Sequence, residues 1–301
     1  MKLQMIIFFI SLFGMTVYAQ NISLTMTQDN LALVNETRSL SLKKGSNSVV
    51  LKNLPFLLEP RSVNFNFKNQ SIKLLEYYFA YDLENTLVML DKSVGRNIRL
   101  IHSEMGTVQG KLISAQSGML VIETTDGELL VISDYTGLQY IIEKSTSQQD
   151  LITEPSLFCS LESKSTSEVS TDLSYLTTGM TWSAEYTAII DESEQEMSLA
   201  TRAMLSNYSG KSFQDCDLLL LAGEINKGPT MRRSISGAGV QQLDDMVTMA
   251  SESDFSESEN FEYHIYRLGR KITLANQQQK ILPLYPIQKS EISKIYNYHV
   301  Y

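Results

Sequence analysis

Hydrophobic and polar residues alternate along most of this chain of 301 residues. Near the N-terminus, Ile22, Leu24 and Met26 are separated by polar residues. Because successive side chains of a β-strand point to opposite faces, a period of two predicts strands with one apolar face. The Gly, Ser and Asn residues of "KKGSNS" (43–48) predict a hairpin turn. Residues 20–72 are therefore predicted to form a hairpin-rich N-terminal β segment.

Residues 73–146 show a different pattern. The stretch "YDLENTLVML" (81–90) has apolar residues at helical spacing, and Asp82 is placed to cap the helix. Five short apolar stretches separated by tight turns follow, at 96–102, 107–114, 118–124, 128–133 and 138–142. One helix followed by five closely spaced strands predicts a small barrel of the SH3-like or Sm-like kind.

A polar stretch, 145–150, separates this barrel from a second strand-rich region, 150–301. Within that region "TWSAEYTAII" (181–190) places its apolar residues on one face of a strand, namely Trp182, Ala184, Tyr186, Ala188 and Ile190. An indole that alternates with other apolar residues is typical of a sheet core, because a large aromatic side chain buries a large area. The fold class is therefore predicted as mainly β, with few helices: an immunoglobulin-like β-sandwich carrying the small barrel as an insertion.

The strand pattern continues and is then interrupted once. "TRAMLSNYSGKSF" and "DCDLLLLAGEIN" are predicted as the next pair of strands, with Gly210 at the turn between them. Residues 226–260 lose the alternation, and their second half has six acidic residues and no basic one. This composition predicts a long mobile loop. Strand patterns return at 261–268 and 271–285.

The first 19 residues indicate export. Lys2 precedes an apolar run that closes on Val17-Tyr18-Ala19, which is the pattern of a signal peptide cleaved after Ala19. The run is shorter than the roughly 20 apolar residues that a membrane-spanning helix needs, and no second such run follows. We therefore expect an exported, periplasmic or extracellular protein of the cell envelope, with no transmembrane segment in the mature chain.

Charge argues against nucleic acid as a partner. The formal net charge is −9. Sm-like barrels can bind RNA, but residues 96–144 carry four basic and six acidic side chains. A negatively charged phosphate backbone is a poor partner for such a surface.

Two cysteines, Cys159 and Cys216, lie in strand-like stretches. An oxidising compartment permits a disulfide between them, and two buried free thiols are the alternative. Spacing alone does not decide between these, because a disulfide requires the two Cα atoms to be close in space.

Catalytic and metal-binding motifs are scarce. The chain has three histidines and no G-x-S-x-G sequence, and His264 shares an alternating face with Glu262 and Tyr266. His264 and Glu262 are the weak candidates for a catalytic site, and a structural strand histidine is the alternative. The sequence has no H-E-x-x-H, C-x-x-C or calcium-loop motif, so no metal and no cofactor is expected. The stretch "SGKS" (209–212) lacks the first glycine of a phosphate-binding loop.

Four blocks of the sequence resemble one protein family. They cover residues 31–65, 173–191, 207–226 and 263–285, and they resemble the bacterial "domain of unknown function 4139" family, some of whose members are described as mucoidy-inhibitor-A-like. The resemblance implies exported, β-rich envelope proteins with no established activity and no catalytic residues to transfer. It also implies a small barrel-like insertion, in agreement with residues 73–144.

The end of the chain departs from that family, whose members usually continue past the last block with further strands. We therefore expect either a longer reading frame or another chain that covers an open sheet edge.

Two functions are consistent with these observations. The first is a non-catalytic exported protein that acts as a scaffold or as a protein- or glycan-binding module, with exposed sheet faces and the loop 226–260 as candidate surfaces. The second is an envelope hydrolase acting on glycan or peptide. The absence of recognisable catalytic motifs favours the first. The sequence leaves the oligomeric state open.

Overall fold

The computed structural model describes residues 19–68, 71–83, 85–102, 106–116, 118–133, 137–143, 151–223, 255–260 and 263–299. The protein is mainly β, with several sheets, as the sequence predicts. It divides into two compact units, one made of residues 1–49, 54–76 and 159–301 and the other of residues 50–53 and 77–158. One three-stranded sheet has the order β3 (Gly45–Leu51), β11 (Ser156–Ser163) and β5 (Ile72–Ala80).

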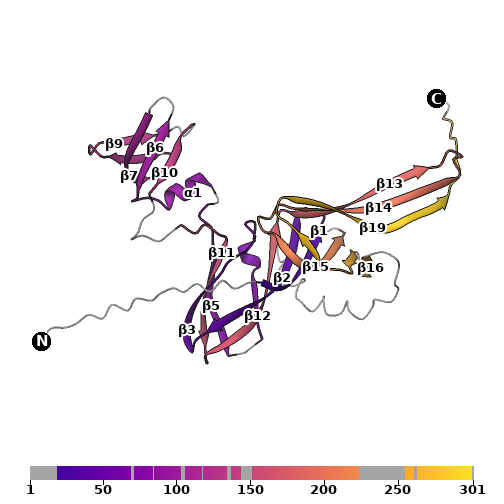
Figure 1. Ribbon diagram of the computed structural model, residues 1–301, viewed down its shortest axis with the longest axis horizontal. Helices are drawn as coiled ribbons and strands as arrows, with labels where there is room; N and C mark the ends of the chain where they lie inside the picture. Colours follow the sequence, from indigo (N-terminus) through magenta and orange to yellow (C-terminus); the bar gives the residue numbers. More distant parts are fainter. Residues whose placement is uncertain are drawn as a thin grey trace. The chain divides into compact units, whose positions relative to one another are not determined.

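The larger unit contains an eight-stranded sheet (Figure 1). Its main order is β16 (Phe255–Asn260), β17 (Tyr263–Leu268), β15 (Phe213–Ala222), β1 (Ala19–Thr27), β2 (Leu31–Leu42), β12 (Ser167–Thr178) and β4 (Asn64–Phe67), and β18 (Ile272–Leu274) also pairs with β15. The pair of β1 and β15 is parallel, and the other pairs are antiparallel.

Two long strands, β2 and β12, are neighbours in this sheet. They pair over twelve positions, from Leu31 opposite Thr178 to Leu42 opposite Ser167. Along β2 every second residue is buried, which confirms the period of two expected from the sequence. This pairing unites the N-terminal β segment with the later strands in one unit, whereas the sequence predicts them as separate regions. The hydroxyl of Thr37 in β2 donates a hydrogen bond to the carboxylate of Asp172 in β12, 135 positions further along the chain. Pairing between strands so far apart in the sequence leaves no local signal.

The second layer of the sandwich is a three-stranded sheet formed by β13 (Met180–Ile190), β14 (Glu196–Asn207) and β19 (Gln278–Glu291). Trp182 in β13 is 2% exposed, and its indole N–H donates a hydrogen bond of 3.0 Å to the carbonyl oxygen of Leu221 in β15. The indole also packs edge-on against Tyr266 of β17, with ring centroids 5.7 Å apart. The prediction that Trp182 belongs to the core is confirmed.

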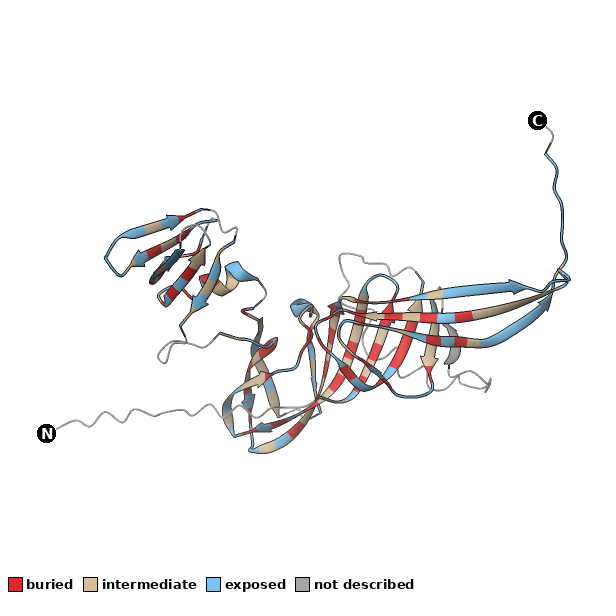
Figure 2. Cartoon of the chain, turned by 45° about the horizontal axis from the view of Figure 1, so that its top comes forward, coloured by how far each residue is buried: buried red, intermediate tan, exposed pale blue. Residues whose placement is uncertain are grey.

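The prediction is wrong for the outer half of the same strand. Beyond Ala184 the side chains of β13 are exposed, and Tyr186 is 66% and Ile190 is 55% exposed. Figure 2 shows the change from buried to exposed residues along β13 and β19. We call this outer part, residues 185–200 and 286–291, the arm.

In the smaller unit, the five predicted strands are present as one antiparallel sheet of order β10, β6, β7, β8 and β9. Their bounds are β6 (Asn97–His102), β7 (Gly106–Ser114), β8 (Leu120–Thr124), β9 (Leu129–Ile132) and β10 (Gln139–Ile142). β9 and β10 are the end strands of this order. Buried residues of the sheet and of the helix form its core, including Leu90, Ile98, Leu112 and Ile122.

The helix of this unit differs from its prediction. α1 (Thr86–Asp91) begins later than expected, because the Asn85 side chain accepts a hydrogen bond of 3.0 Å from the N–H of Val88 and so caps the helix. The carboxylate of Asp82, the predicted cap, instead accepts a hydrogen bond of 2.8 Å from the N–H of Ile152. Among the described residues, no helix has the length and apolar character needed to cross a membrane.

Three other local predictions are corrected. The turn at 43–48 leads into β3, which lies in a different sheet from β2. The strands on either side of Gly210, β14 and β15, also belong to different sheets. The end of the predicted loop, Phe255–Asn260, is the strand β16 and pairs with β17. Residues 144–150 and 224–254 lie outside the described residues.

Gly210 does adopt the positive φ expected of a turn, at 91°. A side chain at this position would also collide with Phe56, because a Cβ atom would lie 2.4 Å from the Phe56 Cβ. This glycine therefore allows the crossover from one layer to the other to pack closely against the 55–58 segment.

We predict that Trp182→Ala lowers the free energy of unfolding by about 3–5 kcal/mol, because it removes a buried aromatic side chain and its hydrogen bond. The control Tyr186→Ala, on the same strand and face, should change it by about 0.5 kcal/mol or less because Tyr186 is exposed. Urea unfolding of dilute protein followed by circular dichroism measures both. Equal losses in the two variants would contradict the boundary placed between core and arm.

Candidate functional site

The structure describes only one of the two weak catalytic candidates, His264. His264 lies in β17, where it is exposed and opposite Ala222 of β15 and Glu259 of β16. Glu262 lies outside the described residues, so the pair is not placed together. Among the described residues there is no group of three His, Cys, Asp or Glu side chains that could hold a metal ion.

The two cysteines are free thiols, and both are buried. The Cys216 thiol donates a hydrogen bond of 3.1 Å to the carbonyl oxygen of Ile272. Burial raises the pKa of Cys159 to about 12 and, as the main cause, that of Cys216 to about 11. Because the thiolate is the reactive form, neither cysteine is suited to act as a nucleophile near neutral pH.

A cluster of charged side chains lies within the sandwich core. Glu36 and Arg38 occupy inward positions of β2, and Lys211 reaches them from the segment between β14 and β15. Both nitrogens Nε and Nη2 of Arg38 donate to Oε1 of Glu36, at 2.9 and 2.5 Å. The ammonium group of Lys211 donates to the other carboxylate oxygen, Oε2, at 2.8 Å. The single carboxylate therefore binds one cation through each of its oxygens.

Tyr175 of β12 completes this cluster. Lys211 donates to the Tyr175 hydroxyl oxygen at 3.4 Å, and the hydroxyl is hydrogen-bonded to Glu36. Burial, and then the negative charge of Glu36, raise the pKa of Tyr175 well above its ordinary value of 10. Burial lowers the pKa of Lys211, although Glu36 opposes this shift. We name Glu36, Arg38, Tyr175 and Lys211 the buried charge cluster.

The backbone that carries Lys211 is held by Asn207. The side-chain amide of Asn207 donates to the carbonyl oxygens of Lys211, Leu274 and Ala275, at 2.8, 3.1 and 3.1 Å. Its carbonyl oxygen accepts from the N–H and the hydroxyl of Ser209. Polar groups that would otherwise be buried without partners are thus paired, and the Lys211 side chain is directed at Glu36.

Burial determines what the cluster can do chemically. The side chains of Glu36 and Arg38 are 0% exposed and that of Lys211 is 2% exposed. A substrate from solution has no access to these groups, so a role in binding or catalysis is disfavoured. The cluster instead joins β2, β12 and the segment that leads into β15, and it acts as a structural link between them.

This cluster was not predicted from the sequence, although the sequence contains one signal for it. In β2 the inward positions run Ala32, Val34, Glu36, Arg38 and Leu40, so that two opposite charges interrupt an apolar alternation. Charged residues are seldom fully buried unless they are paired, so such an interruption indicates a buried ion pair. The position of Lys211, 175 residues further along the chain, has no comparable signal.

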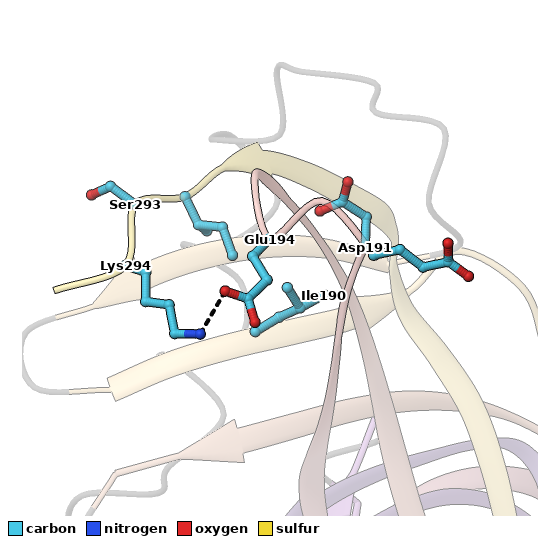
Figure 3. A pocket seen from close by; sticks show the side chains of 7 residues that line it. Ile190, Asp191, Glu194, Ser293 and Lys294 are labelled. Atoms are coloured by element: carbon cyan, nitrogen blue, oxygen red, sulfur yellow. Dashed lines mark hydrogen bonds and ion pairs between the residues drawn. The ribbon is translucent and has the colours of Figure 1, made fainter. Parts of the chain in front are cut away.

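An open hollow lies at the tip of the arm, lined by residues of the β13–β14 turn and of the segment after β19 (Figure 3). Lys294 bridges it by an ion pair of 2.6 Å with Glu194. Asp191 accepts hydrogen bonds from the Ser193 hydroxyl and from two backbone N–H groups of its turn. These bonds, above all the one from Ser193, lower the pKa of Asp191 to about 2. Its carboxylate is therefore ionised at neutral pH and engaged by the turn, so Asp191 is not suited to act as a general acid.

The arm presents the other notable surface. The face that carries Trp182 at the core continues outward along all three strands, because paired residues share a face. Its members in the arm, which we call the arm face, are uncharged: Tyr186, Ala188, Ile190, Met197, Leu199, Gln288 and Ser290. The opposite face carries charged residues, including Glu185, Glu196 and Lys289. Exposed apolar surface of this kind is typical of an interaction site.

In comparisons with known proteins, no family model and no curated protein matches this chain. The resemblance to the family of unknown function therefore stays a prediction.

We predict that a thiol reagent finds no reactive cysteine in the native protein at pH 8, because both thiols are buried and protonated. After unfolding in denaturant without reductant, both cysteines should react. A colour assay for free thiols measures this. Absence of reactive thiols after unfolding would contradict the structure and indicate a disulfide.

We predict that Lys211→Met lowers the free energy of unfolding by about 3–5 kcal/mol, because it leaves part of a buried charge network without its partner. The control Lys289→Met breaks an ion pair with Glu196 whose side chains are 66% and 46% exposed, and it should cost about 1 kcal/mol or less. Urea unfolding curves compare the two. A loss in Lys211→Met as small as that in the control would contradict the assigned structural role.

Proposed function

We propose that this chain is an exported, non-catalytic β protein of the cell envelope, periplasmic or extracellular, that acts by contact, with the arm face as its binding surface. The observation that carries the proposal is the exposed, uncharged face of the arm, where Tyr186 and Ile190 are more than half exposed. The sequence features of residues 1–19 support export.

The polar groups of the larger unit support a contact role over catalysis. The Glu36–Lys211 pair is sealed in the core, and the Asp191 carboxylate is engaged by its own turn. His264, the candidate base of a hydrolase, is exposed on its strand. An enzyme requires a base and a nucleophile that converge on accessible space, and a binding module requires accessible apolar surface. The arm meets the second requirement.

A charge placed on the arm face tests this role. The mature chain, from Gln20 to Tyr301, is immobilised and exposed to an extract of the envelope of the source cells, containing both protein and glycan. Tyr186→Lys should reduce the retained components at least tenfold, because binding would bury an unpaired ammonium group. Ile189→Lys is the matched control, since Ile189 lies on the same strand and the opposite face and is 64% exposed.

Retention should be unchanged in this control. Equal retention by the unmodified chain and by Tyr186→Lys would contradict the proposal that the arm face is the binding surface.

A further inference from the structure

The signal-peptide junction expected from the sequence, the bond between Ala19 and Gln20, lies within the first strand of the larger sheet. β1 begins at Ala19, and its first two residues pair with residues of β2. The register shifts between Gln20 and Ser23, where Asn21 has a positive φ of 48°, and paired residues are present on both sides of this shift. The backbone at the junction is therefore part of a β-ladder in the folded chain.

The strand that follows the junction is internal to the sheet. Along residues 23–27, β1 lies between β2, which is antiparallel to it, and β15, which is parallel to it. Leu24 and Met26 in this part of the strand are 0% exposed. A strand enclosed on both sides opens less readily than a free terminus, because opening breaks two ladders and exposes apolar side chains.

Cleavage by an endopeptidase requires the opposite state of the backbone. The enzyme binds its substrate segment as an extended chain, so a folded protein is cut only when that segment opens locally. From the position of the junction we infer that the signal peptide is removed before β1 enters the sheet, and that the folded precursor resists this cleavage. The inference rests on the proposed export of the chain, and it names what controls the processing step.

The topology provides a period in which the junction is accessible. A two-stranded hairpin is at best marginally stable in water, so β1 and β2 alone do not hold the junction closed. The strands that complete the sheet around them come much later in the chain, since Ser23 pairs with Asp217 of β15 and Leu31 pairs with Thr178 of β12. The junction therefore stays open until these distant strands have paired.

Cleavage at this bond is compatible with the final sheet. Hydrolysis consumes one water molecule and leaves a carboxylate on Ala19 and an amine on Gln20. The rest of β1 stays in the mature chain, including all the residues that pair with β15. The sheet loses only the pair that Ala19 makes with β2.

The full precursor, residues 1–301, tests the inference. It is folded in detergent, mixed with purified signal peptidase and followed by intact mass, and N-terminal sequencing identifies the cut. The comparison is the same chain made by cell-free synthesis with the peptidase present from the start, so that the junction is accessible before the sheet forms. The folded precursor should be cleaved at least about tenfold more slowly, because cleavage must wait for local opening.

Two variants keep residues 1–20 unchanged and alter only the sheet. An insertion of about six Gly and Ser residues between Gln20 and Asn21 is a flexible spacer, which moves the junction ahead of the sheet while β1 keeps its pairs. Leu24→Pro excludes β1 from the sheet, because proline has no N–H for the ladder and Leu24 is fully buried. Both should be cleaved as fast as the newly made chain, and circular dichroism should show that the spacer variant is folded.

The outcomes separate this inference from the proposed function. Equal cleavage rates for the folded precursor and the newly made chain overturn the inference and leave export intact. Resistance of the folded spacer variant also overturns it, because the sheet is then not what protects the bond. If no chain is cut after Ala19, even during synthesis, the signal peptide itself is wrong, and the export in the proposed function fails as well. The contact role is tested separately, by retention in Tyr186→Lys.

Discussion

Trp182 lies where the larger sheet of the sandwich ends and the three-stranded sheet continues beyond it. Its indole N–H binds the carbonyl of Leu221 near the end of β15, and its ring packs against Tyr266. This contact anchors the root of the three-stranded sheet to the larger sheet. Beyond it, β13, β14 and β19 continue without a facing layer among the described residues. The arm and its accessible apolar face both follow from this position of the indole.

The buried charge cluster affects the register of the strands. A buried ion pair adds little net stability, because removing two charges from water costs about as much as their attraction returns. The cluster instead favours the native strand register over a shifted one. If β2 slipped by one residue, Glu36 and Arg38 would face outward and Lys211 would be buried without a partner. The bonds from Asn207 fix the backbone that presents Lys211. We interpret the cluster as a constraint on strand register and on the crossover between layers.

These two features lead to the same functional interpretation. The ionisable groups of the core are sealed from solvent, and one of the two faces of the arm, the arm face, is uncharged. Chemistry on a soluble substrate needs accessible titratable groups, whereas association needs accessible apolar area. The arm face is the feature of the larger unit that supports the proposed contact function. The exposed position of His264 is consistent with the alternative reading of it as a structural strand histidine.

The sequence by itself determined the class of the fold, most strand positions and the burial of Trp182, because alternation with a period of two is a local property of the chain. It also contained the interrupted alternation at Glu36 and Arg38, which marks a buried ion pair. Only the tertiary structure decided that β2 pairs with β12, that Lys211 closes the charge cluster, and that Tyr186 and Ile190 are exposed. An apolar residue in an alternating strand is buried only where another layer covers it. The extent of that layer depends on strands far away in the sequence, so the pattern of β13 alone could not show where the core ends and the arm begins.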